Sequence, residues 1–152
     1  MDASPRAAFA GTTQSSSGQG EHKVRWSAWF RCESSFSLLL VPGQPGVYVV
    51  GEEVIAPGEV ASLGARRMLA VLEVGATDDL ARALSRLFTA ASAIRDRLLN
   101  ARCFVRFAQV SDAAQREAVC AALQNWLAGA AHAAGEARRE GVASPALLPA
   151  GF

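Results

Sequence analysis

Two side chains in short apolar runs carry groups capable of chemistry. Tyr48 lies in the run Gly46–Val50 (GVYVV), and Glu73 lies in Met68–Gly75 (MLAVLEVG). Tyr48 is either a packing residue of a buried strand, which we favour, or a catalytic phenol. A carboxylate at the end of an apolar strand reaches solvent, pairs with a cation such as Arg106 on a neighbouring strand, or acts as a general base.

Four arginines form a candidate nucleic-acid-binding patch. Arg66 and Arg67 stand in an expected loop, and Arg82 and Arg86 are four residues apart, on one side of an expected helix. Guanidinium groups bind phosphate well. The alternative, which we favour, is a solvated surface on which these arginines pair with nearby carboxylates. The carboxylates in question are Asp78, Asp79, Glu52 and Glu53.

These side chains require strands to position them. The β-branched and aromatic run Val47–Val50 follows a Pro/Gly turn and is typical of a buried strand, which can continue toward Ile55. Met68–Val74 predicts a second strand, antiparallel to the first because the connection is short. Arg102–Val110 (RCFVRFAQV) predicts a third strand. Phe36–Val41 predicts a further short strand or extended segment.

Helices are expected after the second and third strands. Thr77 or Asp78 can cap the first helix, and a shorter helix spans Ala93–Leu99. Asp112 begins the longest helix, which extends to about Ala133. This order predicts an α+β domain with a small three-stranded antiparallel sheet flanked by helices. The apolar face of the first helix comprises Leu80, Leu84, Leu87 and Phe88.

The order of the elements and two short motifs resemble the GIY-YIG nuclease domain. Gly46-Val47-Tyr48 stands where that family has GIY on its first strand, and Glu73-Val74-Gly75 stands where it has YIG on its second. The segment Thr77–Leu80 resembles the turn into the family's first helix. The resemblance covers residues of about 45–128 and implies descent from a phosphodiester-cleaving domain.

In active members of that family, two tyrosines, an arginine on the first helix and a metal-binding glutamate on a later helix form the site. Tyr48 matches the first tyrosine, and Glu73 replaces the second. The arginine is expected near Ala83, one position from Arg82, and Glu117 lies a turn or more before the expected glutamate. The resemblance therefore implies a degenerate site without a metal-ligand set. Mg²⁺ or Mn²⁺ is expected only if the chain is an active nuclease.

Composition narrows the function classes. The net charge is +1, and residues 46–133 hold nine arginines and nine acidic residues, which counts against strong, salt-driven nucleic-acid binding. No GxSxG motif or Gly-rich phosphate loop is present, so nucleophilic triads and phosphate cradles are not indicated. Three widely spaced cysteines predict buried thiols rather than zinc or a disulfide scaffold. They are Cys32, Cys103 and Cys120.

The chain divides into four expected parts: a disordered tail (1–22), an aromatic lead-in arm (23–45), the α+β domain (46–133) and a flexible C-terminal tail (134–152). The arm carries Trp26, Trp29 and Phe30 between basic residues. It either covers the edge of the core, which we favour, or stacks on nucleic-acid bases. The N-terminus lacks a secretory apolar region, and no apolar run spans a bilayer, so we expect a cytoplasmic protein without membrane contact.

Three functions remain open. The favoured one is a non-catalytic binding module that recognises a protein partner or, weakly, DNA or RNA. The second is a metal-dependent endonuclease that cleaves DNA with a rearranged site. The third is a structural or oligomerising domain that uses exposed apolar surface around Trp26, Trp29 or Trp126.

Overall fold

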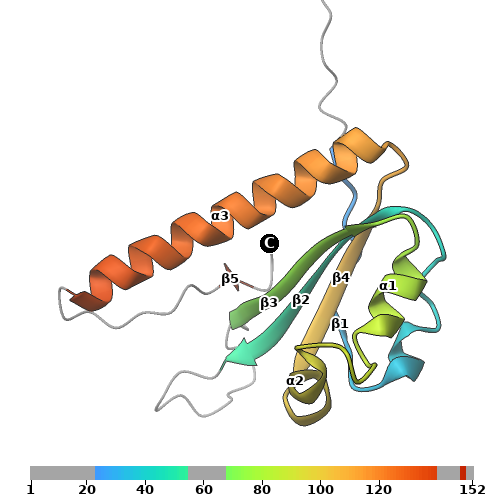
Figure 1. Ribbon diagram of the computed structural model, residues 1–152, viewed down its shortest axis with the longest axis horizontal. Coiled ribbons are helices and arrows are strands. Elements are labelled where there is room, and N and C mark those ends of the chain that lie inside the picture. The colour runs from blue at the N-terminus through green and yellow to red at the C-terminus, as the bar shows by residue number, and fades with distance from the viewer. Residues whose placement is uncertain (1–22, 55–67, 140–147, 150–152) are drawn as a thin grey trace, which may run out of the picture.

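The computed structural model describes residues 23–54, 68–139 and 148–149, which form one antiparallel sheet with helices on both faces (Figure 1). The predicted tail at 1–22 lies outside the described residues. So does most of the predicted C-terminal tail at 134–152.

The sheet has three long strands and two short edge strands. From one edge to the other they are β1 (Phe30–Arg31), β4 (Cys103–Gln109), β2 (Gly46–Val54), β3 (Met68–Thr77) and β5 (Leu148–Pro149), each antiparallel to its neighbours. The predicted α+β class and its three antiparallel strands are confirmed. Because β2 lies in the centre, hydrogen bonds pair it on both edges, and its apolar, β-branched run suits that buried place.

Alternation along β2 defines two faces of the sheet. Tyr48 and Val50 point to one face, and Val47 and Val49 point to the other. Three short helices cover the first face, and one long helix crosses the second (Figure 1). The helices are η1 (Ser35–Leu38), α1 (Leu80–Arg86), α2 (Arg95–Asn100) and α3 (Ala113–Arg139).

The main hydrophobic core lies between the sheet and the short helices. The leucines expected on the core face of α1 are buried, while Phe88 is partly buried against the same cluster. Strands β2 and β4 contribute buried side chains to this core from the sheet, and η1 and α2 contribute buried leucines at its periphery. The buried residues of the cluster are Cys32, Leu38, Val41, Tyr48, Val50, Leu80, Leu84, Leu87, Leu98, Cys103 and Val105.

The turn between β3 and α1 is capped one residue later than expected. Asp79, not Thr77 or Asp78, is the N-cap of α1, and its carboxylate accepts a hydrogen bond of 2.9 Å from the backbone N–H of Arg82. The hydroxyl of Thr77 accepts from the N–H of Asp79 at 3.1 Å. This second bond holds Asp79 in the extended conformation that a cap requires.

Two further expectations need correction. Phe36–Val41 is not a strand, because η1 turns the chain so that Leu38 and Val41 are buried. The long helix continues past Ala133 to Arg139, so the start of the predicted flexible tail is helical. Its predicted opening is confirmed, since the carboxylate of Asp112 accepts a hydrogen bond of 2.6 Å in the first turn.

Arg116 connects the layers on the two sides of the sheet. Its guanidinium is buried and donates to the carbonyls of Val110 and Ser111 at 3.1 and 2.9 Å. The same group forms an ion pair of 2.5 Å with Asp78, in the turn before α1. One side chain therefore fixes the start of α3 to the turn that positions α1.

Candidate ligand-binding pocket

The two motif glycines are required by close packing. A Cβ atom on Gly46 would lie 2.2 Å from the carbonyl oxygen of Ala108 and 2.7 Å from Cδ1 of Leu80. A Cβ on Gly75 would lie 2.4 Å from Cζ of Tyr48. Gly46 therefore lets β2 approach β4 and α1, and Gly75 leaves room for the tyrosine ring.

Tyr48 and Glu73 form a direct pair on the first face of the sheet. The register places Tyr48 opposite Gly75 and Val50 opposite Glu73, and a bulge at the Val50–Gly51 step adds one residue to β3. The Tyr48 hydroxyl donates a hydrogen bond of 2.7 Å to Oε1 of Glu73. Burial, followed by the hydrogen bond and negative charge of Glu73, raises the pKa of Tyr48 well above its usual range.

The pair lies in an open pocket of about 600 Å³ between the end of β3 and α1. Arg86, in the last turn of α1, also lines this pocket. Among the described residues its guanidinium has no hydrogen bond or ion pair. The pocket therefore combines a phenol, a carboxylate and a guanidinium. The remaining lining residues are Ala76, Thr77, Ala83, Leu87, Thr89, Ala91, Ser92 and Ala93.

The other predicted site residues lie elsewhere. Arg82 is exposed on α1 and does not line the pocket, because it is about 100° around the helix from Ala83, which does. Glu117 is exposed on α3 and is also absent from the lining. Arg66 and Arg67 lie outside the described residues. Among the described residues, the candidate site therefore contains Tyr48, Glu73 and Arg86 but neither Arg82 nor Glu117.

Sequence reasoning missed the hydroxyl residues of the pocket. Thr89 and Ser92 lie after α1 and before α2, between the two predicted helices. The hydroxyl of Thr89 donates to the carbonyl of Arg86 at 2.7 Å and helps to close the helix. The signal available was a run of small and hydroxyl residues directly after an arginine.

The acidic residues expected to pair with the patch arginines have other partners. Glu52 pairs with Arg97, and Glu53 pairs with Arg102 at 3.0 Å. Asp78 pairs with Arg116, as described above, and Asp79 caps α1. The expectation that Arg82 and Arg86 on α1 pair with these carboxylates is therefore wrong. The carboxylates instead bind a backbone N–H or other arginines.

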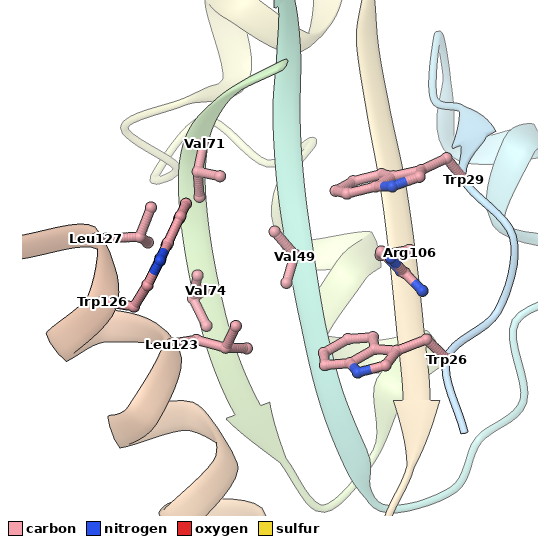
Figure 2. Close-up of a pocket in the computed structure, with 9 residues that line it drawn as sticks. All are labelled: Trp26, Trp29, Val49, Val71, Val74, Arg106, Leu123, Trp126 and Leu127. Atoms are coloured by element: carbon pink, nitrogen blue, oxygen red, sulfur yellow. The ribbon is translucent and has the colours of Figure 1, made fainter. Parts of the chain in front are cut away.

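Glu73 does not pair with Arg106, contrary to one expectation. Strand β2 separates β3 from β4, and Arg106 lies opposite Val49, on the second face of the sheet. There its guanidinium lies 5.1 Å from the ring centre of Trp26 and 5.3 Å from that of Trp29 (Figure 2). Burial lowers the pKa of Arg106 from its usual value. The indole rings supply favourable electrostatics for a buried cation.

The first part of the arm, residues 23–32, covers the β4 edge of the sheet. Trp26 bridges to Ala108, and Phe30 and Arg31 form β1 against β4. Figure 2 shows the two indole rings on either side of Arg106, across an apolar slot from Leu123, Trp126 and Leu127 of α3. The interpretation that the arm covers an edge of the core is confirmed. The side chains bordering the slot from the sheet include Val49, Val71 and Val74.

Comparison of this chain with protein-family models, with curated proteins and with solved structures gave no match. The resemblance to the GIY-YIG domain therefore stays a prediction that rests on the motif residues. Among residues 23–54, 68–139 and 148–149, no three His, Cys, Asp or Glu side chains gather as a metal-binding cluster would. None of the described helices has the length and apolar character needed to cross a bilayer.

Proposed function

We propose that this chain is a catalytically degenerate, GIY-YIG-like domain that acts as a binding module for a polypeptide partner. The pocket around Tyr48, Glu73 and Arg86 receives a charged segment of that partner. The observation that carries the proposal is that one open pocket holds Glu73 together with Arg86, which has no ion-pair partner in the described part of the chain.

Mixed charge in the pocket favours a polypeptide over a nucleic acid. A nucleic-acid backbone presents negative charge throughout, so Arg86 would attract it and Glu73 would repel it. A peptide can offer a basic side chain to the glutamate and an acidic one to the arginine. Such complementarity gives specificity rather than high affinity.

The pairing of Tyr48 with Glu73 also supports binding over catalysis. The phenol already donates its proton to a carboxylate at 2.7 Å, and its raised pKa further opposes the loss of that proton. A protonated phenol held in this way is a poor general base. The pair instead fixes the Glu73 carboxylate in one orientation for a ligand.

One observation favours the endonuclease alternative. Tyr48 and Arg86 line the same pocket, and a phenol and a guanidinium are the groups that the resemblance assigns to phosphodiester cleavage. In that case a divalent cation such as Mg²⁺ or Mn²⁺ would supply Lewis-acid chemistry. Glu117, the metal-binding candidate, is not among the pocket residues. Experiments can distinguish peptide binding from DNA cleavage.

A phage-displayed random-peptide selection tests the proposal. We expect enriched peptides that carry both charge signs, bound at micromolar affinity and weakened by salt, as expected of exposed charge pairs. Arg86→Gln and Glu73→Gln should each weaken binding about tenfold or more, as loss of a charge-assisted hydrogen bond does. Arg82→Gln is the matched control, since Arg82 is a nearby exposed arginine outside the pocket.

Nicking of plasmid and branched DNA is measured in parallel with Mg²⁺ or Mn²⁺. Cleavage that is removed by a chelator and by Arg86→Gln or Tyr48→Phe would overturn the binding proposal in favour of the nuclease. Peptide binding that Arg82→Gln weakens as much as Arg86→Gln would remove the pocket from the mechanism. Self-association without peptide or DNA binding would favour the structural alternative.

A further inference from the structure

Two cysteines face each other across the edge of the sheet. In the pairing of β1 with β4, Phe30 lies opposite Val105 and Arg31 lies opposite Phe104. The next step of this antiparallel register places Cys32 opposite Cys103. The backbone N–H of Cys32 donates to the carbonyl of Cys103 at 2.9 Å, so the register continues through the pair.

Directly opposed residues of an antiparallel pair have Cα atoms about 4.5 to 5.5 Å apart, and their side chains lie on the same face. A disulfide bond accepts Cα separations of about 4.4 to 6.8 Å. Cys32 and Cys103 are both buried in the same core cluster, and both are free thiols. The backbone therefore satisfies the reach of a disulfide without a shift of either strand.

We propose that Cys32 and Cys103 form a reversible disulfide that fastens the arm to β4 under oxidising conditions. The oxidant is a low-molecular-weight disulfide, such as oxidised glutathione. One protein thiolate attacks a sulfur of the oxidant and releases one thiol, and the second protein thiolate then displaces the other. The protein thiols lose two protons and two electrons, and the oxidant becomes two thiols.

The reaction is controlled by opening of the arm. Burial, together with the neighbouring Cys103, raises the pKa of Cys32 to about 11, and burial and Glu52 raise that of Cys103 to about 11. Few thiolates therefore form while the core is closed. Because β1 has two residues and lies at the sheet edge, local opening exposes the pair more readily than unfolding of the core.

The disulfide would hold the arm in the position in which it covers Arg106. Trp26 and Trp29, on either side of that guanidinium, precede Cys32 on the same arm (Figure 2). In the reduced protein, the contacts that hold the arm are non-covalent: backbone pairing, ring contacts and a hydrogen bond of 3.0 Å from the Phe107 N–H to the Ser27 hydroxyl. Oxidation would therefore change how often the second face of the sheet is uncovered.

The test uses the full chain incubated with oxidised glutathione at about pH 8.5, where exposed thiols are partly ionised. After alkylation, trypsin separates the three cysteines into peptides Cys32–Arg66, Cys103–Arg106 and Glu117–Arg138. We expect the first two to be linked by mass spectrometry and the third to carry only the alkylating label. The melting temperature should rise by roughly 5–15 °C on oxidation.

Two sets of variants complete the experiment. Cys120→Ser should keep both the link and the rise in melting temperature. Cys32→Ala and Cys103→Ala should each abolish them, and using both guards against one variant that fails to fold. Three unreacted thiols, glutathione adducts without an internal link, a bond to Cys120 or a bond between chains would overturn the proposal.

Discussion

Each face of this sheet carries one arginine that differs from the other in solvent exposure and in the groups around it. On the first face, Arg86 lines an open polar pocket and has no ionic partner among the described residues. On the second, Arg106 is 7% exposed and lies between two indole rings beneath the arm. An arginine that faces solvent, such as Arg86, is available to bind a ligand. An arginine enclosed by aromatic rings, such as Arg106, contributes to the stability of the fold.

Matched truncation of the two arginines tests this contrast most strongly. Arg106→Ala should lower the free energy of unfolding by about 2–4 kcal/mol, because it removes two cation–π contacts and leaves a cavity. Arg86→Ala should change the free energy of unfolding by less than about 0.5 kcal/mol, as exposed positions usually do. Urea unfolding followed by tryptophan fluorescence measures both. Equal losses would contradict the assignment of roles.

A second prediction concerns the glycine beneath the pocket. Gly75→Ala should destabilise the fold by about 1–3 kcal/mol, since its methyl group would overlap the Tyr48 ring. The loss should be smaller in a Tyr48→Ala background, which frees the space. Thermal and urea unfolding measure both.

The control for this prediction is Gly129→Ala in α3. A Cβ there has no atom within 4 Å, so the substitution should stabilise the helix by about 0.5–1 kcal/mol. A loss at Gly129 as large as that at Gly75 would show that packing against Tyr48 is not the cause.

The smallest effect is a pH dependence, and it reports on the pocket directly. Folding raises the pKa of Tyr48, so the fold favours the neutral phenol. Its stabilising contribution is complete below the ordinary phenol pKa of about 10 and is lost as the pH rises above that value. Wild-type stability should therefore fall above about pH 10 more steeply than that of Tyr48→Phe, which lacks the group.

The chain has a single tyrosine, so phenolate absorbance reports this group alone. The folded protein should form phenolate at higher pH than the same chain in denaturant. Coincident titration curves would contradict both the burial of Tyr48 and its hydrogen bond to Glu73. Tyr48→Phe itself should cost about 1 kcal/mol at neutral pH, the usual value for a hydrogen bond.

Local sequence pattern predicts the three long strands of the sheet but not the short edge strands β1 and β5. The apolar, β-branched runs around Tyr48, Glu73 and Arg106 are strands in the structure, and α1 buries the face that its leucine spacing indicates. Such signals depend only on residues that are close in sequence, so they can be read without knowledge of the fold. Phe36–Val41 was less informative, because a short apolar run does not distinguish a strand from a helical turn.

Features that depend on strand order were not predictable. A cross-strand pair of Glu73 and Arg106 requires β3 to lie beside β4, but β2 lies between these strands. The two side chains also lie on opposite faces of the sheet. The choice of Arg86 over Arg82 depends on where α1 starts and on the pocket beside it. The opposition of Cys32 and Cys103 likewise appears only when the arm pairs with β4.

The contact between Gly75 and Tyr48 also restricts the order in which substitutions at these two positions can accumulate during evolution. A side chain at position 75 overlaps the Tyr48 ring, so it destabilises the fold more while the ring is in place than after the ring is lost. Loss of the ring would in turn leave Glu73 without its hydroxyl donor. Lineages that abandon this pocket should therefore lose the aromatic residue before the glycine, and the reverse order should be rare.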